Sequence, residues 1–550
     1  MGYIRVIHVL LLVLSFVVVS FPQIGVAMAD NKVYIRADGN VDGTDKIERT
    51  GNVYSFTDNI TATIVIEKND ITIDGAGYTL FANSSHGIDL HHRHGVTVKN
   101  LVLKDTYHGF DFTYADDNTI IGNTLIHSDS AFYFWWSWGN NVTGNTISRA
   151  NYAFNFFQSP NYWCQENVVI GNTVYDSSIG LSLVESNNTI SDNILNCSVI
   201  GVSLKGSQNV FRNNTINCSG SGIGFKPYSF NNDVDTSNSV NGKPIIYWIN
   251  HRDETVPLDA GCVVLSNCEN IKVQNLNANG FNMHSTTNSL ISGNTFSGGQ
   301  FGIQMVGCSN NTITGNSLVC NEFGLELDDC HYNKVVANNI SSNSHYGLLL
   351  TSSHYNNMTQ NHIVYNGFGK GPSSSGFSYE TYRGDLFGVK LLYSCNNRFI
   401  ENNVAENSGW GIRILGNQHD NILYQNNFID NGSGDGIQVS MLPPYASSSV
   451  ANISTWDNGV CGNYWSDYQS RYPNASEIGN TGIGDTPFYI NDNNIDHYPL
   501  MEPMEISEIP SKYVIPEFPV WLVLPFLITA TLAAVTCKHK LNKTPCILGA

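Results

Sequence analysis

The chain has 550 residues, of which only 13% are charged, and its formal net charge at pH 7 is -19. Nucleic-acid-binding domains need a basic surface that pairs with phosphates, so this composition excludes a nucleic-acid partner. An acidic surface keeps a protein soluble outside the cell but does not define a substrate.

The first 29 residues are typical of a secretory signal. Arg5 precedes an apolar run that begins at Val6 and ends at Val19, and Ala27 and Ala29 supply small residues for cleavage. We therefore expect residues 1–29 to be removed and the remaining chain to fold outside the cell.

An asparagine then recurs about every 22 residues in the phrase Gly-Asn-Thr/Ser. A fixed period of this length indicates a solenoid, in which each repeat packs against its neighbours. A second phrase alternates apolar and other residues, as in Gly109-Phe110-Asp111-Phe112, which is typical of a short strand with one buried face. Three such strands per period predict an all-β, single-stranded parallel β-helix, with N-terminal coils over 30–225 and C-terminal coils over 261–445. The asparagines that stand in Gly-Asn-Thr/Ser are Asn123, Asn145, Asn172, Asn294 and Asn316.

These asparagines are interpreted as structural. Stacked coils lie about 4.8 Å apart, so an amide at the same turn of each coil can pass a hydrogen bond to the next. Asparagine also tolerates the left-handed turn conformation. A second column is predicted at Asn321, Asn343, Asn366, Asn407 and Asn431.

Histidines gather in the early coils, namely His86, His91, His92, His94, His108 and His127. His92 and His94 point to one side if their segment is extended, and His91 lies beside them. Such a cluster could hold copper or zinc. The alternative is a set of exposed turn histidines without a metal.

Aromatic residues are unusually dense one coil further on. Aligning the coils by their outward positions stacks Asp89, Asp111, Tyr133 and Asn155 in one column. Aromatic rings beside carboxylates and amides suit sugar recognition, because a ring covers the apolar sugar face while polar groups bind hydroxyls. The alternative is aromatic packing under a long turn. The candidate glycan-binding residues are Asp89, Asp111, Tyr133, Trp135, Trp136, Trp138, Asn155, Phe157 and Trp163.

Two pairs of cysteines follow the repeat. Cys197 and Cys218, like Cys308 and Cys330, should occupy equivalent places on adjacent coils. The coil spacing fits the Cα separation of a disulfide, and an exported protein meets an oxidising environment. Each pair is therefore a disulfide candidate, and a ladder of unoxidised thiols is the alternative.

The C-terminal coils contain the candidate catalytic residues. Asp328 and Asp329 are adjacent and lie close to outward-facing Glu326, with Lys390 and Arg413 in the same column two or three coils on. Carboxylates with a nearby basic group are what polysaccharide hydrolases and lyases require. Fold alone does not supply this chemistry.

The C-terminal end is read as a cap, a linker and a membrane anchor. Residues 446–500 form the predicted cap, where Asp485, Asp492 and Asp496 are candidate calcium ligands, with a plain capping turn as the alternative. Residues 501–517 form a linker, 518–537 a transmembrane helix and 538–550 a cytoplasmic tail with lysines. Asn-X-Ser/Thr sequons such as Asn141 and Asn357 predict glycosylation.

Two segments break the repeat and resemble a known family. One is the predicted insertion over 226–260, with Asn241-Gly242-Lys243-Pro244-Ile245-Ile246-Tyr247-Trp248. The other contains Gly462-Asn463-Tyr464-Trp465-Ser466-Asp467-Tyr468 and Gly482-Ile483-Gly484-Asp485. With the repeats, they are similar to the NosD-type β-helix family, whose repeats are described as carbohydrate-binding and sugar-hydrolysis (CASH) domains. The resemblance implies a right-handed helix and covers about residues 60 to 500. Ile515-Pro516-Glu517-Phe518-Pro519 resembles the Pro-Glu-Phe sorting signal of archaeal surface proteins, which implies a span that is exchanged for a lipid anchor.

We therefore expect an extracellular, C-terminally anchored β-helix that binds a cell-surface or environmental glycan or serves a structural role. The first alternative is a polysaccharide lyase or glycoside hydrolase built on Glu326, Asp328, Asp329, Lys390 and Arg413. The second, implied by the NosD resemblance, is a copper-binding or maturation protein. Calcium and copper are the candidate ions.

Overall fold

The computed structural model describes residues 31–157, 164–219, 222–368, 386–416, 418–432, 438–442 and 453–506. The chain divides into two compact units, Met1–Met504 and Glu505–Ala550, and every element below belongs to the first. The predicted signal, the linker from residue 507 onward, the Pro-Glu-Phe motif, the span over 518–537 and the tail lie outside the described residues. Among the described residues, no helix is long and apolar enough to cross a membrane.

The longest sheet in the described part has 23 strands and extends through both halves of the solenoid. Its N-terminal members are β1 (Lys32–Ile35), β2 (Val41–Asp42), β5 (Ile60–Thr61), β6 (Thr63–Ile66), β8 (Thr79–Phe81), β9 (Ile88–Asp89), β11 (Val102–Thr113), β13 (Thr124–Trp135), β15 (Thr146–Phe156), β17 (Thr173–Leu183), β19 (Ile194–Leu204), β21 (Thr215–Cys218), β22 (Ile223–Pro227) and β24 (Ser239–Val240). Its C-terminal members are β25 (Lys243–Ile249), β26 (Cys262–Ser266), β29 (Phe281–His284), β32 (Phe301–Val306), β35 (Phe323–Asp328), β38 (Tyr346–Thr351), β41 (Phe387–Leu392), β44 (Trp410–Leu415) and β47 (Val439–Leu442).

Three further sheets complete the coils. In the N-terminal half, a sheet of ten described strands contains β3 (Ile47–Thr50), β4 (Val53–Phe56), β7 (Thr72–Asp74), β10 (Thr97–Lys99), β12 (Thr119–Ile121), β14 (Asn141–Thr143), β16 (Val168–Ile170), β18 (Thr189–Ser191), β20 (Val210–Arg212) and β23 (Asp233–Val234). In the C-terminal half, one sheet contains β27 (Lys272–Gln274), β30 (Leu290–Ser292), β33 (Thr312–Thr314), β36 (Lys334–Val336), β39 (Asn357–Thr359), β42 (Arg398–Ile400), β45 (His419–Tyr424) and β48 (Ile453–Thr455). The other contains β28 (Asn277–Ala278), β31 (Thr295–Ser297), β34 (Ser317–Val319), β37 (Asn339–Ser341), β40 (His362–Val364), β43 (Asn403–Ala405), β46 (Asn427–Ile429) and β49 (Tyr464–Trp465).

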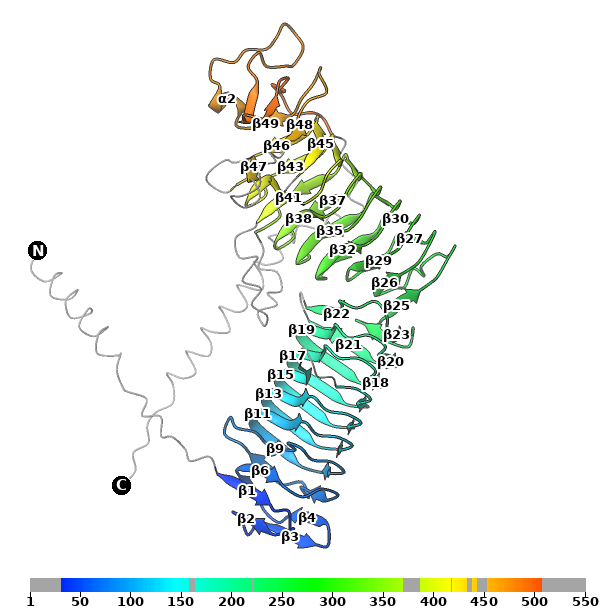
Figure 1. Cartoon of the computed structure of the whole chain (residues 1–550), viewed down its shortest axis with the longest axis vertical. Helices are drawn as coiled ribbons and strands as arrows, with labels where there is room; N and C mark the ends of the chain where they lie inside the picture. Colours follow the sequence, from blue (N-terminus) through cyan, green and yellow to red (C-terminus); the bar gives the residue numbers. More distant parts are fainter. Residues whose placement is uncertain are drawn as a thin grey trace, which may run out of the picture. The chain divides into compact units, whose positions relative to one another are not determined.

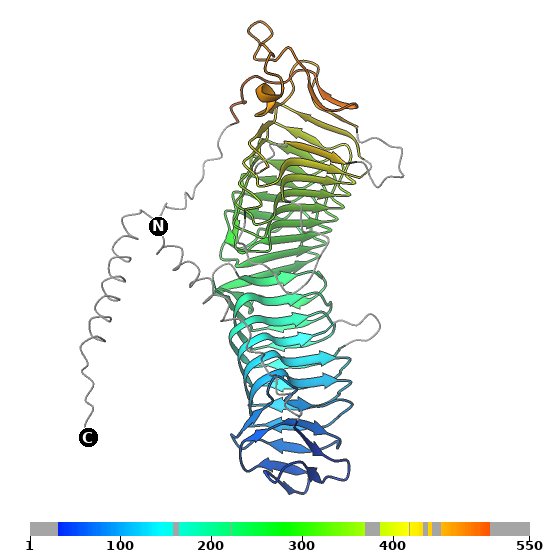
Figure 2. The same cartoon turned by 90° about the vertical axis from the view of Figure 1, so that its left-hand side faces the viewer.

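The strands stack one above another as parallel coils (Figures 1 and 2). Phe110 pairs with Phe132, and Phe132 pairs with Phe154, in parallel register. Among the named strands, antiparallel pairs occur at β1 with β2, β3 with β4, β24 with β25, and in the cap. The predicted all-β parallel solenoid with coils of about 22 residues is therefore confirmed.

A short cap follows the last coil. It contains the helix α2 (Tyr468–Arg471) and the antiparallel pair β50 (Phe488–Asn491) and β51 (Asn494–Asp496). Trp456 and Trp465 are almost fully buried beneath it, and the Trp465 ring stacks on Phe488 with centroids 4.4 Å apart. These rings cover the open end of the core.

We call residues 32–240 the N-terminal stack and residues 243–465 the C-terminal stack. Each has its own apolar core, and they meet at β25, where Ile245 and Tyr247 pack in the first core and Ile246 in the second. Because side chains alternate along a strand, β25 is buried on both faces. The segment 226–260 thus contributes β23, β24 and β25 to the stacked sheets.

Buried asparagine ladders hold the corners of the coils together. Asn145 is typical: its Nδ2 donates to Asn172 Oδ1 at 3.0 Å, and its Oδ1 accepts the backbone N–H of Asn123 at 2.8 Å. The two columns predicted from the sequence are confirmed as such ladders. A further ladder precedes the main one by five residues, with Asn118, Asn140, Asn167, Asn188, Asn209 and Asn232 in the N-terminal stack, and Asn311, Asn333, Asn356, Asn397 and Asn421 in the C-terminal stack.

Candidate functional site

One outward-facing column of the longest sheet carries polar groups through the N-terminal stack. Parallel register places Asp89 beside Asp111, Asp111 beside Tyr133, and Tyr133 beside Asn155. The column continues through Ser182 and Ser203 to Lys226. The alignment predicted from the repeat is therefore confirmed, and the neighbouring column likewise places Thr113 beside Trp135.

Two histidines converge on one carboxylate in this column. His86 precedes β9, and His108 and Asp111 lie on β11, one coil on. Asp111 Oδ2 lies 3.0 Å from His86 Nδ1 and 3.2 Å from His108 Nδ1. These are hydrogen-bond distances, so with Asp111 ionised each Nδ1 donates to the same oxygen.

The surroundings of Asp111 fix its carboxylate. Its Oδ1 accepts the backbone N–H of Thr113 at 3.0 Å and the Thr113 hydroxyl at 2.5 Å. Burial alone would raise the pKa of Asp111, but the hydrogen bonds from His108, His86 and Thr113 outweigh it and hold the pKa well below its usual range. Asp111 is therefore ionised at neutral pH although its side chain is only 8% exposed.

Aromatic rings continue from this group across the next two coils. Tyr133 stacks on His108 with centroids 4.0 Å apart, and its other neighbour is Phe157, at 6.0 Å. Burial, and then the charge of Asp111, raise the pKa of Tyr133 to about 12, so its hydroxyl remains a donor. Asn155 Nδ2 donates to Ser130 Oγ at 3.2 Å.

A turn column adds the more exposed aromatic rings. Tyr114 and Trp136 both have positive φ at the end of their strands, and their ring centroids are 4.6 Å apart. Trp136 in turn lies 6.5 Å from Trp138, and Tyr114 lies 5.6 Å from Trp135. Trp138 is 38% exposed and Phe157 is 49% exposed, whereas Trp135 and Trp136 are half-buried. We call Tyr114, Trp135, Trp136, Trp138 and Phe157 the aromatic face; Trp163, predicted to join it, lies outside the described residues.

The predicted metal ligands do not converge. Among the described residues, the group of metal-ligating side chains is His86, His108 and Asp111, not His91, His92 and His94. His92 stacks on Tyr114, with His91 beside it, and His94 lies next to Asn69. Metal binding by His91, His92 and His94 therefore stays a prediction, and the structure instead brings together His86 and His108, which lie one coil apart.

The candidate calcium ligands of the cap are also apart from one another. Asp496 is fully buried and accepts the backbone N–H of Asn463 at 2.7 Å and the Trp465 indole N–H at 2.9 Å. Asp485 accepts the N–H of Ser476, and Asp492 is exposed. The capping-turn alternative therefore accounts for Asp496, and calcium binding by these three residues stays a prediction.

The candidate catalytic residues are partly brought together. Register runs from Glu326 through Leu349 and Lys390 to Arg413, so Leu349 separates the carboxylate from the bases. The Tyr346 hydroxyl donates to Glu326 Oε2 at 2.7 Å, and burial raises the pKa of Glu326. Asp328 follows on the same strand, but Asp329 enters the turn, 3.4 Å from His331. With strands about 4.8 Å apart, Glu326 lies about 10 Å from Lys390 along the column.

The four predicted disulfide cysteines are free thiols. Cys197 and Cys218 do lie opposite each other in register, and the Cys308 backbone N–H donates to Cys330 Sγ at 3.3 Å. The structure thus shows the thiol-ladder alternative. Burial raises the pKa of Cys218 to about 12 and that of Cys197 further, which makes both thiols unreactive.

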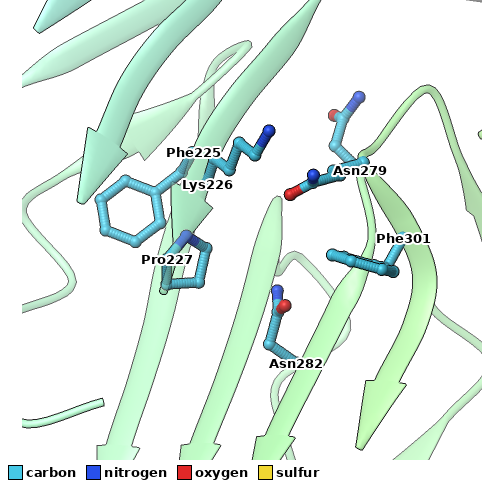
Figure 3. Close-up of a pocket in the computed structure, with 7 residues that line it drawn as sticks. Phe225, Lys226, Pro227, Asn279, Asn282 and Phe301 are labelled. Atoms are coloured by element: carbon cyan, nitrogen blue, oxygen red, sulfur yellow. The ribbon is translucent and has the colours of Figure 1, made fainter. Parts of the chain in front are cut away.

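Two cavities lie near the junction of the stacks. One, lined by Phe225, Lys226, Asn282 and Phe301 among others, has a volume of about 10 Å³, which is room for a water molecule and not for a sugar (Figure 3). Burial lowers the pKa of Lys226 to about 8. The other is an open groove of about 380 Å³ whose lining includes Asp233, Tyr247 and His251.

Comparison with protein families gives a clear assignment. The model of the family described as "Periplasmic copper-binding protein (NosD)" matches residues 24–199, 126–256 and 231–470. The chain belongs to the NosD family. No curated protein matches this NosD-family chain significantly.

Solved structures resemble this NosD-family chain in fold only. The periplasmic alginate epimerase AlgG is 13% identical over 74% of this chain and 83% of its own, with a TM-score of 0.24. The A-module of mannuronan C-5 epimerase AlgE6 from Azotobacter vinelandii is 13% identical over 72% and 89%, with a TM-score of 0.22. A mannuronic acid specific polysaccharide family 6 lyase from human gut microbiota is 12% identical over 62% and 82%, also with a TM-score of 0.22.

Sequence reasoning placed His86 and His108 among the crowded histidines of the early coils but selected His91, His92 and His94 as ligands, and it did not single out Tyr114. The signal was present, because His86 and His108 are 22 residues apart, the same interval that separates stacked residues such as Thr106 and Ser128. Reading the histidines by coil position would have paired them.

Proposed function

We propose that the protein is an exported surface protein that binds polysaccharide along the aromatic face of its N-terminal stack. The observation that carries this proposal is that partly exposed rings, led by Trp138 and Phe157, lie beside the polar column of Asp111, Tyr133 and Asn155. A sugar ring presents an apolar face and a rim of hydroxyls, and this surface offers partners for both.

The stacked sheets give this surface a fixed geometry. Tyr133 and Asn155 are held in register by β13 and β15, and inward-facing Phe132, Phe134, Phe154 and Phe156 are fully buried beneath them. Binding residues on rigid strands lose little conformational entropy when a ligand binds. An extended polymer can follow the column from coil to coil.

We also propose export and C-terminal anchoring, on the basis of the sequence. The signal over 1–29, the apolar run over 518–537 and the Pro-Glu-Phe motif support a location on the outer face of the cell membrane, held by a span or by a lipid. The family's description as periplasmic agrees with export.

The test is glycan binding by the purified full-length chain, solubilised in mild detergent, on an array of acidic and neutral polysaccharides. Changing Trp136 and Trp138 together to alanine should weaken binding at least tenfold, about 1.4 kcal/mol. The matched control changes Tyr332 and Tyr355, an exposed pair in the C-terminal stack whose rings stack 5.1 Å apart, and should leave binding intact.

Binding that is lost only in the tryptophan variant supports the proposal. Equal loss in both variants, or no binding to any glycan, contradicts it. Release of shortened or unsaturated products would instead favour the lyase or hydrolase alternative, and a Glu326→Gln variant would then show whether that carboxylate takes part.

A further inference from the structure

We propose that His86, His108 and Asp111 form a binding site for one divalent transition-metal ion on the outer face of the N-terminal stack. One ring nitrogen of each histidine and a carboxylate oxygen of Asp111 all lie within 4.8 Å of one another. The site shares Asp111 with the polar column of the proposed glycan-binding surface, but metal uptake is measured without glycan, so the two proposals can fail separately. The proposal names ligands and an ionic class that the family's description leaves open.

The spacing of the ligand atoms matches a coordination sphere. A zinc ion bound at about 2.0 to 2.1 Å by imidazole nitrogen and carboxylate oxygen holds two tetrahedral ligands about 3.3 Å apart, and two adjacent octahedral ligands about 2.9 Å apart. Asp111 Oδ2 lies 3.0 Å from His86 Nδ1 and 3.2 Å from His108 Nδ1. The three atoms therefore need only small rotations to surround an ion, which would replace the two shared hydrogens.

Neighbouring groups hold these ligands in place, as outer-shell partners do in established metal sites. Thr113 binds the other oxygen of Asp111 through its backbone N–H and its hydroxyl. The His108 ring lies against the rings of Tyr107 and Tyr133, with centroids 4.5 and 4.0 Å away.

Solvent can reach the group through His86. The side chains of His108 and Asp111 are 10% and 8% exposed, whereas that of His86 is 36% exposed. An ion can therefore enter past His86, and water can supply the remaining ligand positions.

The donor set selects the class of ion. Two imidazoles and one carboxylate suit Zn²⁺, Co²⁺, Ni²⁺ and Cu²⁺, whereas Cu⁺ prefers thiolate and thioether sulfur, which this group lacks. Calcium requires six to eight oxygen ligands and does not fit. The site is thus assigned to divalent ions and not to cuprous copper.

The experiment is a titration of the chelator-treated full-length chain with Co²⁺, followed by visible absorption and by competition with Zn²⁺. His86→Gln is the main variant, because the half-exposed His86 is replaced without opening the core, and Asp111→Asn is the second. The matched control is His127→Gln: His127 Nδ1 lies 2.7 Å from Asp105 in the same stack, but that pair contains only one histidine.

We expect about one Co²⁺ per chain, absorption bands of nitrogen and oxygen ligation, and displacement by Zn²⁺. His86→Gln and Asp111→Asn should weaken binding by at least about 100-fold, and His127→Gln should not change it. Circular dichroism and the unfolding midpoint show that each variant is folded.

Three results would overturn the proposal: no uptake of Co²⁺ or Zn²⁺ by the folded wild type, equal affinity in wild type and folded His86→Gln, or tighter binding of Cu⁺ than of the divalent ions at this site. In the first case the three groups form only the hydrogen-bonded network seen in the structure.

Discussion

The N-terminal and C-terminal stacks share one repeat but differ at one corner of the coil. In the C-terminal stack, Asn321, Asn343 and Asn366 form a buried ladder at this corner and separate two short strands. In the N-terminal stack, Thr106 and Ser128 stand at the corresponding place, inside the unbroken strands β11 and β13. The turn itself is alike, since the residue just before the corner has positive φ in both, as at Asp105 and Ser342.

The difference shows that the turn conformation and the asparagine ladder are separable. A left-handed residue bends the chain in both stacks, but the asparagine amide can also both accept from and donate to the backbone of neighbouring coils, whereas the hydroxyls of Thr106 and Ser128 bond to each other. Where threonine or serine replaces the asparagine, as at Thr106, the strand continues around the corner to the outer column that contains His108 and Asp111. The N-terminal stack thus has less corner bonding in the segment that carries the candidate sites.

The largest test of this comparison removes one corner residue from each stack. Asn343→Ala leaves the backbone N–H of Asn321 and the carbonyl of Leu318 without their partners, which are 3.0 Å away in both cases. Two unsatisfied buried groups cost about 1 to 3 kcal/mol each, so we expect the free energy of unfolding to fall by about 3 kcal/mol or more.

The paired variant in the N-terminal stack is Ser128→Ala. Ser128 Oγ accepts one bond, from the Thr106 hydroxyl at 2.7 Å, and alanine already stands next in the column at position 150. We expect a loss of about 1 kcal/mol. Urea unfolding of both variants measures the difference, and equal losses would show that the ladder adds nothing to the corner.

A second test concerns an ionisable side chain in another inward-facing column of the stacks. In the C-terminal stack this column contains Cys330 and Ser353. The backbone N–H of Cys330 donates to Ser353 Oγ, so the bond between these two coils involves no charged group. In the N-terminal stack this column contains Glu185, where burial raises the pKa of the carboxyl from 4.5 to about 7, against a hydrogen bond from the Cys164 backbone. The folded state therefore binds the proton more tightly than the unfolded state.

The sign of the pH dependence follows from that shift. The stabilisation is fully present below pH 4.5, decreases as the pH rises towards 7, and is lost above it. The change amounts to about 3 kcal/mol, at about 1.4 kcal/mol per pKa unit. Glu185→Gln, which is neutral throughout, should flatten this part of the stability curve, and Ser353→Ala should leave it unchanged. A curve of wild-type shape in Glu185→Gln would assign the dependence to another group.

The architecture could be predicted from the sequence because the repeat interval reflects the stacking of the coils. The period, the alternation of apolar residues and the ladder through Asn145 and Asn316 follow from counting, and so does the column from Asp89 to Asn155. Each is a property of backbone register, which a 22-residue interval determines.

The candidate site was harder to predict from the sequence because it depends on side-chain direction and burial. The run His91, His92 and His94 attracted attention because its members are adjacent in sequence, but the histidines that share a carboxylate are His86 and His108, one coil apart. Asp496 was read as an oxygen ligand, yet it is buried and its oxygens accept the N–H groups of Asn463 and Trp465. No pattern in the sequence distinguishes a carboxylate that accepts backbone hydrogens from one that faces an ion.

The smallest predicted effect concerns the turn that both stacks share, just before the main asparagine ladder. Gly144 in the N-terminal stack has φ of +63°, and Ala337 in the C-terminal stack has φ of +51° at the equivalent position. A side chain at Gly144 would meet no atom within 4 Å, so Gly144→Ala costs only the strain of the left-handed conformation. We expect the free energy of unfolding to fall by about 0.5 to 1 kcal/mol, because the lower entropy of the unfolded alanine chain offsets part of that strain.

The reverse change, Ala337→Gly, should raise the free energy of unfolding by about as much. Since the conformation is common to the two stacks, these changes should be equal and opposite in urea unfolding. Unequal changes would mean that the stacks differ in their turns as well as in their corner residues.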